Sequence, residues 1–251
     1  MKKHFFFLLF ICITCITSNV EASGISNTNG VEQKTISTDL KYSMIPAQGE
    51  TDGALCNFQS GKESLGKGWK GHGAEFAGIK SSGSITGVHA KLAVFAPGTV
   101  EYGQYSAAYV SVESGEGGSR NQIKAGWVVN PCYFNDNEVH FFLSFLGDDE
   151  GNCWDTSCDD FIATWGTNDL KLGDILTPSK VGHADQTFLE IFIGQDDKVK
   201  MWFLNANGRG VGYWKGEYFS TLLKGATTTR IGGEAYTPQG GIRVHLWEVV
   251  L

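Results

Sequence analysis

Apolar and polar residues alternate with a period of two in several stretches after about residue 75, as they do in half-buried β-strands. Polar turns such as 195–198 and 207–208 separate these stretches. The strands predicted in this way are 90–96, 105–113, 122–129, 139–146, 188–193, 199–204 and 242–250. Only 217–224 has a helical pattern. We therefore predict an all-β fold, a sandwich of two antiparallel sheets with one short helix.

The start of the chain differs from this pattern. Residues 1–22 contain two lysines, an apolar run and a small residue at the end, which is typical of a secretory signal peptide. A membrane anchor is the alternative, but the apolar run is shorter than the roughly 20 residues that span a bilayer. Residues 23–65 form a polar leader that we expect to be tied to the domain by Cys56, and 66–251 form the β-sandwich domain. The protein is therefore expected to be secreted or periplasmic.

Four cysteines remain after the predicted signal peptide: Cys56, Cys132, Cys153 and Cys158. An even number in an exported chain favours disulfides. Cys153 and Cys158 enclose only four residues and are predicted to pair, which leaves Cys56 with Cys132. Zinc in this loop is an alternative that lacks a second ligand pair. Calcium is another, because acidic residues surround the loop, but their spacing matches no known calcium motif. We expect neither a metal nor a cofactor.

The charge balance excludes a further class of partner. The chain has 20 basic and 27 acidic residues, a formal net charge of −7, and shows no basic cluster suited to a polyanion. Nucleic acid and membrane are therefore not expected as partners. The string 66–71 fits a dinucleotide-binding pattern, but it neither follows a strand nor opens a helix, and serine-hydrolase and zinc-peptidase motifs are missing from the sequence.

Two predicted strands carry charges on a face that is otherwise sheltered. In 121–129, alternation places Gln122 and Lys124 opposite the apolar residues that would face the core. Those apolar residues are Ile123, Ala125, Trp127 and Val129. In 229–236, Glu234 and Tyr236 share a face, and Gly232 beside them leaves room around Glu234. We predict that Lys124 and Glu234 face each other across one cleft.

At these positions the chain resembles the neprosin family of secreted β-sandwich peptidases. The motifs that carry the resemblance are 122–127 with Pro131, 151–154 with Cys158 and Phe161, 212–214, and 232–234. The resemblance implies a glutamic peptidase that cuts after proline at acid pH, and a family disulfide between Cys153 and Cys158. Glu234 matches the glutamate of the family's Gly-Gly-Glu motif. Lys124 occupies the position of the second family glutamate, before Ala-Gly-Trp.

A lysine at that position changes the expected chemistry. Its ammonium favours the ionised form of Glu234 and does not act as the missing acid, although it can polarise a carbonyl. Glu113 and Glu190, on predicted strands, are candidate replacements, with surface carboxylates as the alternative interpretation. Tyr109 shares a strand face with Glu113 and is a candidate binding residue, as are Gln122 and Tyr236.

We therefore expect a secreted domain related to proline-directed glutamic endopeptidases that is weak or inactive as a peptidase and binds peptide, including proline-rich peptide, in the cleft. One alternative is an active peptidase that uses Glu234 with a different partner. The other is an extracellular glycan-binding or structural sandwich in which Lys124 and Glu234 form only a salt bridge. We expect a monomer.

Overall fold

The computed structural model describes residues 43–46, 74–116, 119–146, 152–155, 158, 160–167, 169–180 and 185–237. The predicted signal peptide, Cys56 and the predicted strand 242–250 lie outside the described residues. The predicted leader contributes one described strand, which pairs with the edge of a sheet.

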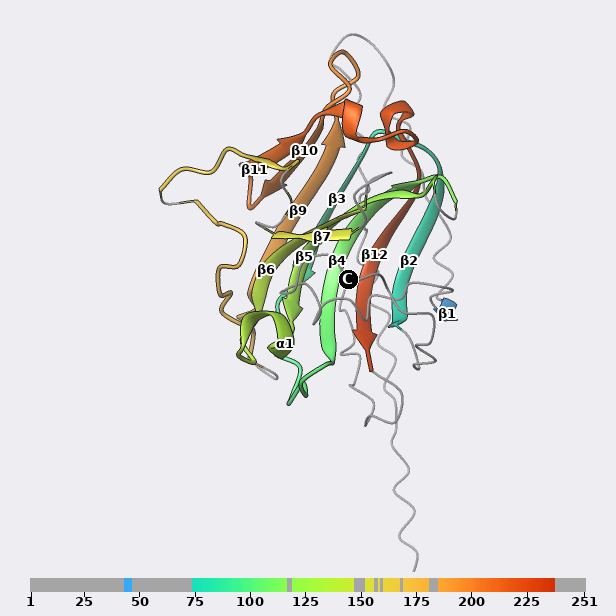
Figure 1. Cartoon of the computed structure of the whole chain (residues 1–251). Helices are drawn as coiled ribbons and strands as arrows, with labels where there is room; N and C mark the ends of the chain where they lie inside the picture. Colours follow the sequence, from blue (N-terminus) through green and yellow to red (C-terminus); the bar gives the residue numbers. More distant parts are fainter. Residues whose placement is uncertain are drawn as a thin grey trace, which may run out of the picture.

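Two sheets make up the fold, and all neighbouring strands in them are antiparallel (Figure 1). The seven-stranded sheet has the spatial order β1 (Ser43–Pro46), β2 (Ala74–Ile85), β12 (Ala226–Tyr236), β4 (Tyr105–Ser114), β5 (Asn121–Val129), β6 (His140–Leu146) and β7 (Asn152–Trp154). The five-stranded sheet has the order β3 (Gly87–Ala93), β9 (Phe188–Gln195), β10 (Trp202–Ala206), β11 (Arg209–Trp214) and β8 (Ile162–Ala163). The predicted all-β sandwich is confirmed.

The main core lies between the two sheets. It contains the four residues of β5 that alternation assigned to it, packed with residues of the other sheet such as Ile191 and Leu204. The indole Nε1 of Trp127 donates a hydrogen bond to the carbonyl oxygen of Ala93 at 2.9 Å, so this buried polar group is satisfied across the core. The other face of the seven-stranded sheet, which we call the outer face, therefore carries the alternate residues of each strand.

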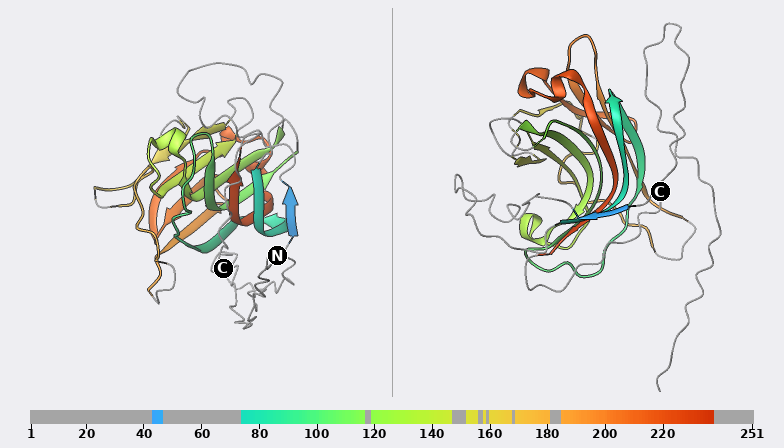
Figure 2. Two further views of the ribbon diagram at one scale, coloured as in Figure 1. Left: turned by 90° about the horizontal axis from the view of Figure 1, so that it is seen from below. Right: turned by 90° about the vertical axis from the view of Figure 1, so that its right-hand side faces the viewer.

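A second cluster of buried residues, mostly aromatic, lies on the outer face. Its members are Phe76, Tyr105, Ala107, Tyr109, Val128, Phe142 and Tyr236. They come from β2, β4, β5, β6 and β12, whose long strands are visibly curved (Figure 2). Charged residues on these strands consequently lie beside aromatic rings.

The helix predicted over 217–224 is wrong. The segment forms two 3-10 turns, η4 (Gly216–Tyr218) and η5 (Leu222–Lys224). The side-chain oxygen Oδ1 of Asn121 accepts hydrogen bonds from the backbone N–H groups of Thr221 and Leu222, at 2.8 and 3.3 Å. These donors are therefore used by another strand and cannot join an α-helical ladder. The apolar spacing instead reflects Phe219 and Leu222 packing into the core.

The short helix of the described residues lies elsewhere, at α1 (Pro131–Phe134). The side chain of Asn130 caps it by accepting from the backbone N–H of Tyr133, and Asn135 ends it in the left-handed conformation. No helix in the described part of the chain is long and apolar enough to cross a membrane. The strand predicted to begin at residue 199 begins at Trp202, because Lys200 has a positive φ of 56°.

Two glycines allow neighbouring strands to approach closely. A Cβ atom on Gly126 would collide with the backbone of Ala108 and would lie 2.7 Å from the Cα of Tyr109. A Cβ on Gly232 would likewise meet the backbone of β2. The glycine beside Glu234 therefore serves strand pairing first, rather than making room for the carboxylate.

We predict that Gly126→Ala lowers the free energy of unfolding by more than about 2 kcal/mol, because the atoms it meets are backbone and cannot turn aside. Gly98→Ala is the control: the glycine is exposed, and a Cβ added to it would have no other atom within 4 Å. Urea denaturation of both variants measures the difference. Equal midpoints for the two variants would contradict this account of the β4–β5 contact.

Candidate functional site

The carboxylate of Glu234 lies on the outer face and is almost completely buried, with 3% of the residue exposed. Its Oε1 accepts a hydrogen bond from the Tyr105 hydroxyl at 2.8 Å and lies 3.4 Å from Nζ of Lys124. Its Oε2 accepts from the Tyr109 hydroxyl at 2.9 Å. Lys124 and Glu234 therefore lie on one face and within reach of each other, as predicted, but they form a buried ion pair rather than the two sides of a cleft.

The sheet register places these groups. Glu234 on β12 lies opposite Ala107 on β4, so Tyr105 and Tyr109 flank it on either side along β4. Lys124 on β5 lies opposite Ser111, four residues further along β4 than Ala107, and its side chain extends back toward Glu234.

The ammonium of Lys124 also contacts an aromatic ring on this path. Nζ lies 4.6 Å from the ring centroid of Tyr109, a cation–π distance. Tyr109 is opposite Gly126, which has no side chain to occupy the outer face between Lys124 and Val128. Tyr109 therefore contacts both charges of the ion pair, one through its hydroxyl and the other through its ring.

The described contacts determine what this arrangement can do. An ionised carboxylate only accepts hydrogen bonds, and here both oxygens do so. The ammonium beside it is a fixed positive charge that can stabilise an oxyanion. Within the described residues, the hydrogen-bond partners of Glu234 are two hydroxyls and this ammonium, and none of them is a carboxylic acid that would donate a proton.

Glu113, a candidate second acid, does not lie beside Glu234. It is six residues from Ala107 on β4, roughly 20 Å along the strand from the position opposite Glu234. Its carboxylate is buried, so the surface interpretation for this residue is wrong. It accepts from the Ser111 hydroxyl at 2.9 Å and pairs with Arg120 and Arg230 at 3.2 and 3.0 Å.

Glu190 lies on β9, in the other sheet. Its side chain is 37% exposed, and it pairs with His89 at 2.7 Å and with Lys91 at 3.8 Å. The surface interpretation holds for this residue, and it has no access to Glu234 because the core separates the two sheets.

The other residues predicted to bind ligand lie on the same face. The ring of Tyr236 stacks on that of Tyr105, with centroids 5.5 Å apart and planes 11° from parallel. Gln122 is buried opposite Glu113, on the side of Lys124 away from Glu234. Tyr105 was not among the candidate residues, although its position on the same strand face as Tyr109 was a usable signal.

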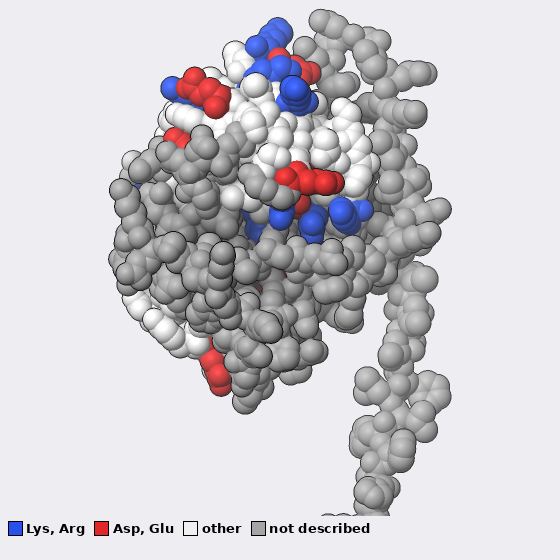
Figure 3. All heavy atoms as spheres, turned by 45° about the vertical axis from the view of Figure 1, so that its right-hand side comes forward, with Lys and Arg blue, Asp and Glu red and all other residues white. Residues whose placement is uncertain are grey.

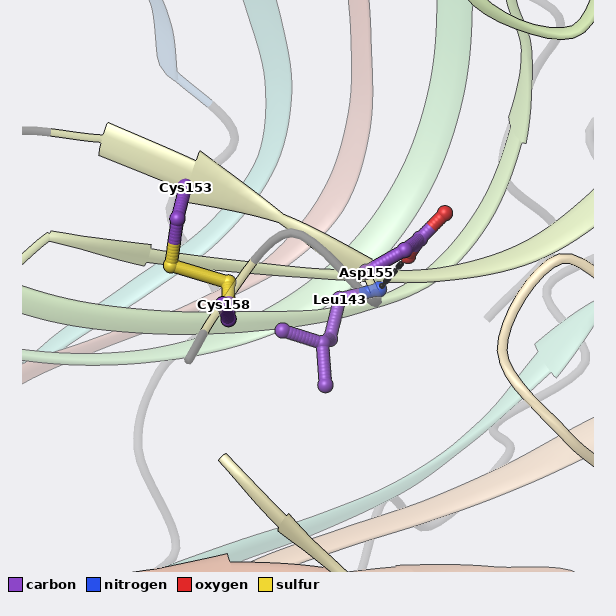
Figure 4. The surroundings of a disulfide bond; sticks show 4 residues. All are labelled: Leu143, Cys153, Asp155 and Cys158. Atoms are coloured by element: carbon purple, nitrogen blue, oxygen red, sulfur yellow. Dashed lines mark hydrogen bonds between the residues drawn. A yellow bond between two sulfur atoms is a disulfide. The ribbon is translucent and has the colours of Figure 1, made fainter. Parts of the chain in front are cut away.

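The predicted disulfide between Cys153 and Cys158 is confirmed (Figure 4). Cys132 is also disulfide-bonded, and its predicted partner Cys56 lies outside the described residues. Of the acidic residues around this loop, Asp148, Asp149, Glu150 and Asp159 lie outside the described residues as well. Within the described part of the chain, no three His, Cys, Asp or Glu residues are grouped as a metal would require.

Asp155, between the two bonded cysteines, is an unusual buried acid. Its Oδ1 accepts a hydrogen bond from the backbone N–H of Leu143 at 2.9 Å (Figure 4), while Oδ2 has no hydrogen-bond partner among the described residues. Burial raises the pKa of Asp155 to about 7. Burial, with the charge of Asp155 as a smaller cause, also raises the pKa of Tyr133 to about 12.

A comparison with known protein families matches residues 102–245 to the family model described as Neprosin. The match covers more than half of the chain. It includes Lys124, Glu234 and the two tyrosines that donate to Glu234.

Lys124→Met should lower the free energy of unfolding by about 3–5 kcal/mol, because it leaves the buried carboxylate of Glu234 without its cation. The double variant Lys124→Met/Glu234→Gln should recover most of that loss. Lys91→Met, which removes an exposed pair, should cost less than about 1 kcal/mol. Denaturant titrations test this, and an equal loss for the Lys91 and Lys124 variants would refute a buried pair.

Asp155 should make stability depend on pH. The folded protein holds this proton up to about pH 7, whereas the unfolded chain releases it near pH 4. Between these values the folded state binds more protons, so the free energy of unfolding falls as pH rises from about 4 to 7. Asp155→Asn should leave stability unchanged below pH 4 and raise the free energy of unfolding by about 4 kcal/mol at pH 8.

Asparagine tolerates the positive φ of 45° at this position, so the substitution introduces no new backbone strain. Asp185→Asn, at an exposed position, is the control and should leave the stability unchanged at both pH 4 and pH 8. Thermal unfolding followed at pH 4 and pH 8 gives the comparison. If Asp155→Asn is less stable than the unmodified protein at pH 8, the ionised carboxylate of Asp155 does not lower the free energy of unfolding and this account is wrong.

Proposed function

The chain belongs to the Neprosin family, a family of prolyl endopeptidases, and we propose that this member binds peptide on the outer face with weak or no peptidase activity. The observation that carries the proposal is the ammonium of Lys124 at 3.4 Å from Glu234. The family's substrate class is polypeptide, so a peptide is the ligand we infer. The predicted signal peptide and the disulfide chemistry support a secreted protein.

The proposed weak activity rests on the charges at the site. Hydrolysis by two carboxyl groups needs one ionised group to activate water and one protonated group to assist the carbonyl or the leaving amine. Two carboxylates held close together share a proton because both cannot ionise easily. A lysine paired with Glu234 removes that repulsion, and with it the reason for a shared proton. Glu113 and Glu190 lie too far away to restore it.

Burial supports the same proposal. Lys124 and Glu234 are only 2% and 3% exposed, so a peptide reaches them only by displacing neighbouring protein. The aromatic rings around the pair are buried as well, so a proline ring packs against them only after the same displacement. Peptide recognition by this cluster needs no proton transfer, whereas peptide cleavage does.

We predict that the purified protein cleaves proline-containing peptides slowly at acid pH and that Lys124→Glu raises the rate at least about 100-fold, by restoring an acid beside Glu234. Lys198→Glu makes the same charge change at an exposed turn and should have no effect. Adding Glu234→Gln to Lys124→Glu should abolish the gain. Peptide cleavage followed by mass spectrometry is the measurement.

The same assay separates the alternatives. Rapid cleavage by the unmodified protein that Glu234→Gln abolishes would identify an active peptidase that uses Glu234 with a different partner. Rapid cleavage that Glu234→Gln leaves unchanged would show that the roles are assigned to the wrong residues. Neither cleavage nor binding of any proline-containing peptide would favour a glycan-binding or structural domain.

A further inference from the structure

Basic residues from three strands form a row on the outer face next to the Lys124–Glu234 pair. Lys80 on β2 lies opposite Arg230 on β12, and Arg230 lies opposite Ser111 on β4. Ser111 in turn lies opposite Lys124 on β5. A single serine therefore separates Arg230 from Lys124. In the space-filling view, Lys and Arg side chains gather in a short row near the centre, next to acidic groups (Figure 3).

Arg230 and Lys80 are the two cations of this row on which an anion site can be built. Arg120, immediately before β5, joins the row through its ion pair with Glu113. Arg230 therefore shares the carboxylate of Glu113 with Arg120, whereas Lys80 has no acidic partner among the described residues. The chain as a whole carries a formal net charge of −7. Two cations side by side, Lys80 and Arg230, attract anions to this part of the outer face of an acidic protein.

Arg230 is the residue in the row best suited to hold an anion. Its Nε lies 3.0 Å from Oε1 of Glu113 but is not aligned to donate a hydrogen bond. Its guanidinium carbon lies 5.7 Å from the ring centroid of Phe76, so the side chain is held against an aromatic surface. Among the described residues, its terminal amino groups have no hydrogen-bond acceptor. Such a fork matches the geometry of a carboxylate.

Lys80 adds a second, more accessible cation. It is exposed, lies directly opposite Arg230, and has no acidic partner among the described residues. Two like charges placed opposite each other on neighbouring strands destabilise a sheet unless an anion lies between them. A ligand carboxylate bound to both would remove this repulsion.

We propose that Arg230 and Lys80 form a subsite that binds an acidic side chain of a peptide ligand. The proposal rests on the proposed peptide-binding function. Arg230 and Glu234 are four residues apart on the same face of β12, roughly 13 Å. An extended peptide lying along the strands has the same rise per residue. The protein therefore selects peptides with Asp or Glu about four residues from the residue that lies over Glu234.

The test measures binding of fluorescein-labelled peptides to the full chain by anisotropy at low and physiological salt. The peptides have a central proline and carry Glu, Gln or Lys four residues before or after it. One peptide has Glu before the proline and another has it after. We expect one of these two to bind about ten-fold more tightly than the peptide with Gln at the same position. Raising the salt concentration should reduce this preference.

Three variants assign the preference to the subsite. Lys80→Gln, at an exposed position, and Arg230→Gln should each remove most of the preference for Glu, measured as the ratio of the affinities for the Glu and Gln peptides. Glu113→Gln removes the competing carboxylate and should increase the preference several-fold. Lys198→Gln makes the same charge change at a distant exposed turn and should have no effect. Lys80→Gln keeps the test valid if Arg230→Gln folds poorly.

Each outcome has a definite meaning. Equal binding of Glu and Gln peptides would overturn the subsite and leave the peptide-binding function standing. Loss of affinity for both peptides in Lys80→Gln would also overturn it, because the residue would then act on binding in general. If no peptide binds but an acidic oligosaccharide does, and Lys80→Gln abolishes that binding, both the peptide ligand and the proposed function are wrong.

Discussion

The buried ion pair between Lys124 and Glu234 is the interaction on which the outer face depends. A charge taken out of water must be compensated, and this pair is compensated by its own partner and by two tyrosine hydroxyls. The pair joins β5 to β12 across β4, so it also ties three strands of the large sheet together. Tyr109 connects its two halves, because its ring lies under the ammonium and its hydroxyl binds the carboxylate.

The same compensation limits the chemistry of the site. A pair of carboxylates is an unstable arrangement that a protein can use for acid–base catalysis, whereas an ammonium beside a carboxylate is a stable one. Under the proposed function, Lys124 stands where the second acid is expected and makes a structural pair of a reactive one without changing the strands that carry it. This explains how a member of the Neprosin family can keep the fold and the aromatic surroundings of the site while its proposed role moves toward binding.

Charge is distributed unevenly along the outer face. Lys124 pairs with Glu234, whereas further along the strands Arg120 and Arg230 both pair with Glu113, next to the exposed Lys80. Near the sheet edge, Asp155 is an acid that burial keeps protonated up to about pH 7. The face thus offers a neutral pair among aromatic rings and a cationic region beside it. A peptide with an apolar centre and an acidic residue several positions away complements both.

The sequence by itself determined which side chains share a face, because alternation follows from local backbone geometry: Lys124 falls on the face opposite Trp127 from the strand period alone. It also determined the short disulfide loop. Only the tertiary structure decided which strands are neighbours and which groups take up free hydrogen-bond donors. Asn121 binds the backbone of Thr221 and Leu222 from a hundred residues away and so prevents the helix that the local pattern predicted. The register likewise holds Glu113 far from Glu234 and brings Tyr105 to it, because such contacts depend on strand pairing over long sequence distances.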